Sequence, residues 1–154
     1  MRQHAYLRIT DEEGNTLDSI AENLGFVSRT DLFTACAHLL IYGELAAGEP
    51  TPDGITADQL TRLHHYSEDV NCMQRTFMEI VREKAIPVIA MKGIATAENA
   101  FGEDIKHLIY ERCGMVPEDT DIRTWFRVFK NLHRAELLEY RSRQFAAALA
   151  GDGE

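Results

Sequence analysis

The side chains that could bind a metal or attack a substrate are the histidines and the cysteines. They are His4, His38, His64, His65, His107 and His133, with Cys36, Cys72 and Cys113. Metal and redox sites use short fixed spacings such as CxxC or HExxH, and neither occurs in this chain. A phosphate-binding loop and a GxSxG nucleophile turn are also absent. The sequence therefore predicts no metal, no cofactor, no catalytic residue and no enzyme, and three reduced thiols.

A second set of candidate residues is a row of basic side chains near the C-terminus. They follow one another at steps of four, three, four and seven residues: Arg123, Arg127, Lys130, Arg134 and Arg141. At 100° per residue these positions fall within about 60° of one another on a helix. Such a stripe can contact nucleic acid or an acidic protein surface. Its plainer interpretation is a solvated face that pairs with some of the 25 acidic residues.

The N-terminus shows a different pattern, in which polar and apolar residues alternate from His4 to Thr10. His4, Tyr6 and Arg8 would share one face, and a period of two predicts a β-strand. A lone strand leaves its backbone hydrogen bonds unsatisfied. Because no second strand is evident nearby, we expect it to pair with the same strand of another copy. The alternatives are an edge strand or an ordered N-terminus.

Two helices are predicted next, over residues 11–24 and 28–42, each with an apolar stripe at helical spacing. Gly25 is a natural end for the first helix, and Ser28 is a good N-cap for the second. Gly14 is a flaw in the first helix, because glycine costs about 1 kcal/mol relative to alanine in a helix interior. Without the strand, the two helices would form a helix-turn-helix or a plain helical hairpin.

The strand, the two helices and the turn between them together resemble the ribbon-helix-helix family, which includes the Arc-like and CopG-like repressors and the nickel-responsive repressor. The turn GFVSRTD at residues 25–31 is similar to the family pattern G-[FY]-x-x-R-[ST]-[ED], and the resemblance covers residues 3–42. It implies an obligate homodimer in which two paired strands enter the major groove of DNA.

The resemblance also assigns DNA contacts to two groups of residues. Outward strand residues would read base edges, and the start of the second helix would offer backbone N–H groups to a phosphate. Arg8 is suited to a bidentate contact with guanine. The two groups are His4, Tyr6 and Arg8 in the strand, and Ser28, Arg29 and Thr30 in the turn.

The domain organisation follows from a break in composition at residues 49–54, where two prolines and a glycine predict a linker. We expect a ribbon-helix-helix dimerisation module over residues 1–48, an all-helical domain over residues 55–149 and a disordered tail over residues 150–154. The predicted fold class is therefore mainly α.

Within the C-terminal domain, a helix is predicted to start at Thr56, which caps it while Gln59 reaches back, and to run to about residue 84. Its apolar residues alternate by three and four. This seam is either a dimeric coiled coil or an intramolecular core face. Residues 86–93 interrupt it as a short strand or buried connector. Further helices are expected over residues 96–113 and from residue 117 to about residue 149.

The charge of the chain limits its partners. It carries 16 basic and 25 acidic residues, a net charge of −9, which counts against a general nucleic-acid binder. Its longest apolar run is far shorter than the roughly 20 residues of a membrane helix, and the N-terminus does not resemble a signal peptide. We therefore expect a cytoplasmic protein with no membrane partner.

Two functions fit these observations. The first is a dimeric DNA-binding regulator, a transcriptional repressor or a plasmid or phage accessory factor, which reads palindromic half-sites with its ribbon. Its helical domain would bind a protein partner or other dimers. The alternative is an acidic dimeric adaptor or an anti-defence inhibitor that blocks a nucleic-acid-processing complex. The strand motif favours the first function, and the overall charge favours the second.

Overall fold

The structure, a computed structural model, describes residues 3–4, 6–43 and 54–152. These residues are mainly α-helical, and none of them forms a β-strand. The chain divides into an N-terminal unit, Met1–Glu68, and a C-terminal unit, Asp69–Glu154. Each unit has its own hydrophobic core. In the part of the chain that is described, no helix is long and apolar enough to cross a membrane.

The N-terminal unit is built from α1 (Asp11–Asn23), α2 (Arg29–Tyr42) and the first half of α3 (Ala57–Ile80). The predicted helices over 11–24 and 28–42 are confirmed, with Ser28 accepting a hydrogen bond from the Asp31 amide at 3.3 Å. The apolar stripes of the three helices meet in one core, because each helix must bury its apolar face. That core consists of Ala21, Leu24, Phe26, Leu32, Ala35, Ile55, Leu60 and Leu63.

The predicted N-terminal strand is wrong. Residues 6–10 approach α1 without regular secondary structure, and Tyr6 is 96% and Leu7 58% exposed. Alternating side chains favour an extended backbone, but a strand also needs a partner for its N–H and C=O groups, and none of the described residues supplies one. A ribbon-helix-helix fold requires a β-ribbon, so the resemblance and the N-terminal ribbon module are both overturned. The expected homodimer loses its basis, since it rested on that strand.

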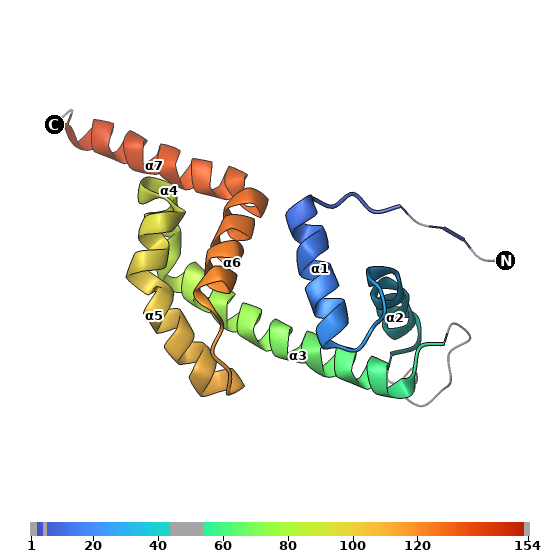
Figure 1. Cartoon of the computed structure of the whole chain (residues 1–154). Helices are drawn as coiled ribbons and strands as arrows, with labels where there is room; N and C mark the ends of the chain where they lie inside the picture. The colour runs from blue at the N-terminus through green and yellow to red at the C-terminus, as the bar shows by residue number, and fades with distance from the viewer. Residues whose placement is uncertain (1–2, 5, 44–53, 153–154) are drawn as a thin grey trace. The chain divides into compact units, whose positions relative to one another are not determined.

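The C-terminal unit contains the second half of α3 and everything after it. Its elements are a π-helical turn (Val81–Ala85), α4 (Ile86–Lys92), α5 (Ile94–Cys113), α6 (Asp119–Leu132) and α7 (Arg134–Asp152). Within this unit α6 lies beside α5, and α7 crosses α4 (Figure 1). Phe77, Ile105, Ile109 and Phe126 lie at the centre of the core. Phe77 contacts the ring of Phe126 edge-on, with 4.9 Å between the ring centroids.

The apolar seam of α3 is divided between the two cores. Leu63 is buried in the N-terminal unit, whereas Phe77 and Ile80 are buried in the C-terminal unit. Between them, residues 64–69 are exposed. Both ends of the seam are therefore intramolecular core faces.

The segment predicted as a strand or connector, residues 86–93, is instead the helix α4, which ends at Gly93. Proline is tolerated in the first turn of a helix, where a backbone N–H has no intrahelical acceptor. Pro87 occupies that place in α4. A π-helical turn lies just before α4. In it the Ile86 amide donates to the Val81 carbonyl, five residues earlier, in place of the α-helical acceptor four residues earlier.

The predicted single helix from residue 117 to about residue 149 is also wrong, because the structure divides it at His133 into α6 and α7. No proline or glycine marks this point. A tertiary cluster surrounds it: the ring of Phe129 stacks on His133 with 4.5 Å between centroids. Arg82, from the π-helical turn, forms an ion pair with Glu136 and lies 5.5 Å from the centre of the Phe129 ring.

The prediction of three reduced thiols is wrong as well. Cys72 in α3 and Cys113 at the end of α5 form a disulfide, with 6.1 Å between their Cα atoms. The sequence held no clue to this pair, because the two residues are 41 positions apart and only the fold brings them together. Cys36 remains a free thiol, and partial burial raises its pKa.

The predicted linker at residues 49–54 falls almost wholly outside the described residues, which resume at Gly54. The expected tail begins within a helix, since α7 extends to Asp152. Residues 153–154 lie outside the described part of the chain.

Candidate functional site

A groove in the C-terminal unit, between α4, α6 and α7, brings together several cations. Its volume is about 510 Å³, within the usual range of ligand-binding pockets. We call it the cationic groove. It is lined by Ile89, Ala90, Met91, Lys92, Gly93, Lys130, Arg134, Leu137, Leu138 and Arg141.

The cations of this groove lack acidic partners. Lys92, Lys130 and Arg134 have no carboxylate within ion-pair distance among the residues that the structure describes, and Arg141 lies over the ring of Phe145 at 5.7 Å. The two glutamates of α7 are paired with other residues. Glu136 contacts Arg82 and His133, and Glu139 contacts Arg143. The groove is therefore a concentration of positive charge that the described residues leave uncompensated.

Between these cations the lining of the groove is aliphatic. Ile89 and Leu137 belong to the buried core and also line the groove. Met91 and Leu138 are 43% and 56% exposed, so their apolar surface faces the groove or solvent. An amphipathic anion matches such a surface, because its charge can meet the cations while its apolar part covers the aliphatic side chains.

Local folding explains how the cations converge. Arg134 and Arg141 are seven residues apart on α7, which places them on one face about two turns apart. Lys92 is the last residue of α4, and Lys130 lies in the last turn of α6. After the break at His133, α7 packs against both α6 and α4, and the end of α6 brings Lys130 to the same groove.

The predicted basic stripe is only partly brought together. Lys130, Arg134 and Arg141 line the groove, whereas Arg123 forms an ion pair with Glu98 at 3.4 Å. Arg127 does not line the groove and has an interaction partner of its own. Sequence reasoning missed Lys92. The signal that could have identified Lys92 is the apolar segment of residues 86–91, which is followed by Lys92 and by Gly93 as a helix end.

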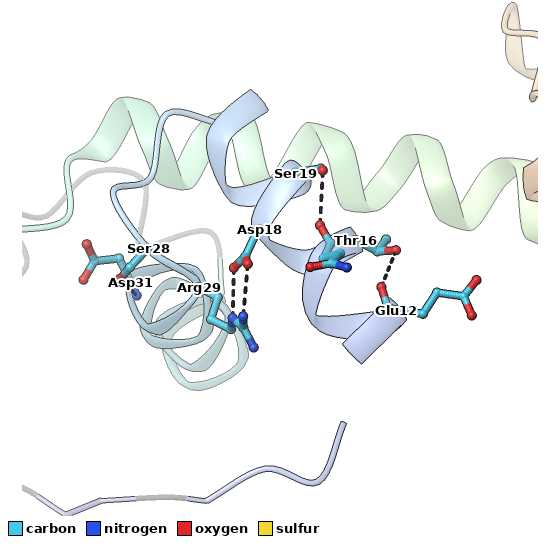
Figure 2. Close-up of polar contacts among 8 residues, drawn as sticks. Glu12, Thr16, Asp18, Ser19, Ser28, Arg29 and Asp31 are labelled. Atoms are coloured by element: carbon cyan, nitrogen blue, oxygen red, sulfur yellow. Dashed lines mark hydrogen bonds and ion pairs between the residues drawn. The ribbon is translucent and has the colours of Figure 1, made fainter. Parts of the chain in front are cut away.

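The residues predicted to contact DNA from the N-terminus do not form one site. His4, Tyr6 and Arg8 are exposed and belong to no helix or strand. Arg29 donates two hydrogen bonds, of 2.9 and 3.0 Å, to the carboxylate of Asp18 in α1 (Figure 2).

The rest of that turn has structural roles. Ser28 uses its hydroxyl to cap α2, and the carbonyl of Thr30 accepts a hydrogen bond from Thr34 at 3.0 Å. Arg29, the only cation in the turn, is thus already engaged within the unit.

The charge of the cationic groove suits the binding of an anionic group. The groove's ionisable groups are two lysines and two arginines, with no carboxylate, histidine or cysteine among the lining residues. Over the described ranges, no cluster of three or more His, Cys, Asp or Glu side chains is placed to hold a metal ion. In comparisons with known proteins, no family model, curated protein or solved structure matches this chain.

Proposed function

We propose that this protein is a non-enzymatic regulator, an adaptor or inhibitor, that acts by binding a partner protein in the cationic groove. One observation carries the proposal: the groove combines four cations, unpaired with carboxylates among the described residues, with an aliphatic lining. Protein interfaces commonly combine an apolar centre with charged groups around it.

The distribution of charge supports this function. Residues 1–68 hold 4 basic and 11 acidic side chains, a balance of −7, whereas residues 69–154 hold 12 and 14, a balance of −2. The C-terminal unit is thus close to neutral, and the groove can attract an acidic group although the whole chain is acidic.

Binding of nucleic acid through the same groove is the second candidate, favoured by the four cations themselves. Phosphate contacts with lysine and arginine provide most of the affinity in such complexes. Two features count against it. None of the described residues forms the strand that pointed to DNA, and the aliphatic lining offers a phosphate backbone no favourable contact.

Site-specific photocrosslinking tests the proposal. A photoreactive amino acid replaces Leu138 in the groove of the full chain, which is irradiated in cells that naturally make the protein. The matched control carries the same group at Tyr110, which is also exposed (59%) but lies outside the groove. We expect a protein adduct that forms from position 138 and not from position 110. A nuclease-sensitive adduct at position 138 would instead support nucleic-acid binding, and equal adducts from both positions would refute a specific site.

A further inference from the structure

We infer that the occupant of the cationic groove is an acidic amphipathic helix of the partner protein, laid along the exposed face of α7. This inference rests on the proposed function and adds the chemistry of the ligand. Three independent features of the C-terminal unit support it: the spacing of residues on α7, the exposure of that helix and the charge of the groove.

The first feature is a helix-pairing pattern on α7. Arg134, Leu138, Arg141 and Phe145 follow one another at steps of four, three and four, the spacing by which one helix presents a seam to another. All four side chains are exposed. On an isolated solvated helix the apolar members of such a seam would face water, so their alignment indicates a helical neighbour.

The second feature is the lack of support for the C-terminal half of α7. Every residue from Arg141 to Gly151 is exposed, including Phe145 at 53% and Leu149 at 74%. Figure 1 shows this part of the helix running on past α4. An isolated helix shorter than about 12–15 residues is marginal in water. A partner helix packed against Phe145 and Leu149 would supply the missing burial.

The third feature is charge complementarity, which favours a partner helix with acidic residues beside its apolar face over one without them. Arg134 and Arg141 are separated by about 10 Å along the axis of α7, from a rise of about 1.5 Å per residue. A partner helix in contact with this seam would place carboxylates about seven residues apart to meet both arginines. Lys92 and Lys130 line the same groove and would face further acidic groups along the flank of that helix.

The experiment uses synthetic helical peptides and the full-length protein. The test peptide carries leucines at alternating steps of three and four, with glutamates seven residues apart beside them. One control peptide has the same composition in an order that scatters the leucines around the helix. A second has lysine in place of every glutamate. Fluorescence anisotropy of labelled peptides measures the dissociation constant at low salt.

We expect the test peptide to bind more tightly than either control. The double substitution Arg134→Glu and Arg141→Glu should weaken its binding about tenfold or more, because two attractive contacts become repulsive. The same variant should bind the lysine peptide better than the unsubstituted protein does. The matched variant changes Arg123→Glu and Arg143→Glu, two exposed arginines outside the groove, and should bind the test peptide within about twofold of the original.

Several results would overturn the inference. They are equal binding of the ordered and scattered peptides, no binding of either, and displacement of the test peptide by a single-stranded or duplex oligonucleotide at lower concentration. A dimer in light scattering that the Arg134/Arg141 variant dissociates would assign the groove to a second copy of the chain. Circular dichroism of both variants checks that they remain folded. If the crosslink at position 138 yields a protein but the peptide does not bind, the proposed function stands and only the helix inference fails.

Discussion

Gly14 shows how a residue that looks unfavourable in the sequence can have a role in the fold. It is buried in the first turns of α1. A Cβ atom added there would lie 3.0 Å from Nη1 of Arg29, the same side chain that bonds to Asp18. The missing side chain therefore makes room for the guanidinium group that ties α2 to α1.

This contact predicts that the effect of Gly14→Ala on stability depends on Arg29. Alanine should favour the helix by up to about 1 kcal/mol, and in the native background it should lose part of that by displacing Arg29 from Asp18. A partly exposed ion pair contributes about 0.2–1 kcal/mol. In the Arg29→Ala background the full gain should appear. Urea unfolding of the four proteins in this double-mutant cycle measures the difference, and an equal effect in both backgrounds would contradict the contact.

Two ion pairs of the C-terminal unit predict sensitivity to acid. The hydrogen bond from Arg112 lowers the pKa of Glu79, and the hydrogen bond from Lys106 lowers the pKa of Asp119. A carboxyl group whose pKa is lowered by folding stabilises the protein above its unfolded pKa, which is about 4. That contribution is lost as the pH falls through the folded pKa.

We therefore expect the stability of the protein to decrease below about pH 4. The variant Lys106→Met removes the partner of Asp119, so the difference in unfolding free energy between it and the original protein should shrink as the pH falls below that point. Urea unfolding at a series of pH values measures this difference. If the difference in unfolding free energy stays constant from neutral pH to below about pH 4, the Lys106–Asp119 pair does not contribute to the acid sensitivity.

Among the helices, α7 is anchored at one end and exposed at the other. Near its start, Leu137 is buried in the core and Glu136 is paired with Arg82. From Arg141 onward the described side chains have no tertiary burial. Local stability follows burial, since few apolar contacts and exposed backbone hydrogen bonds lower the cost of opening.

Hydrogen–deuterium exchange should therefore detect two parts of α7. We expect amides after Arg141 to exchange much faster than amides of α6 around Phe126, which is fully buried. Saturation with the acidic test peptide should slow exchange in the same part of α7. Slow exchange there in the free protein, at a concentration where light scattering gives a monomer, would show that the helix needs no partner.

At the scale of the whole molecule, the Cys72–Cys113 disulfide joins α3 to the end of α5 within the C-terminal unit. The ion pair between Arg112 and Glu79 connects the same two helices beside it. Closing a loop of 41 residues restricts the unfolded chain, and the entropic model assigns about 4 kcal/mol to a loop of this length.

Reduction should accordingly destabilise the protein. We expect a reductant to lower the unfolding free energy by up to about 4 kcal/mol, and to leave a Cys72→Ser/Cys113→Ser variant unchanged. Calorimetry of both proteins with and without the reductant measures the effect. The single variant Cys36→Ser is the control and should respond like the original, because Cys36 is the free cysteine. An identical melting temperature with and without reductant would exclude a stabilising disulfide.

The features that the sequence by itself determined are local. Ser28 caps α2 as expected, and the predicted pair of Thr56 and Gln59 at the start of α3 exchanges hydrogen bonds of 2.9 and 3.1 Å. Gly114 ends α5 in a left-handed conformation with φ of 72°. Each of these signals depends on residues within one or two helical turns, so a short stretch of chain contains all the necessary information.

The remaining features depended on residues far apart in the chain. An alternating segment becomes a strand only if another strand receives its hydrogen bonds, so residues 6–10 could not be assigned from their own pattern. The contact between Arg82 and His133 at the helix break and the Cys72–Cys113 disulfide each join residues at least 41 positions apart. The cationic groove likewise needs Lys92 beside Arg134 and Arg141. Only tertiary packing brings such residues together, because side-chain contacts between distant segments leave no periodic signal in the sequence.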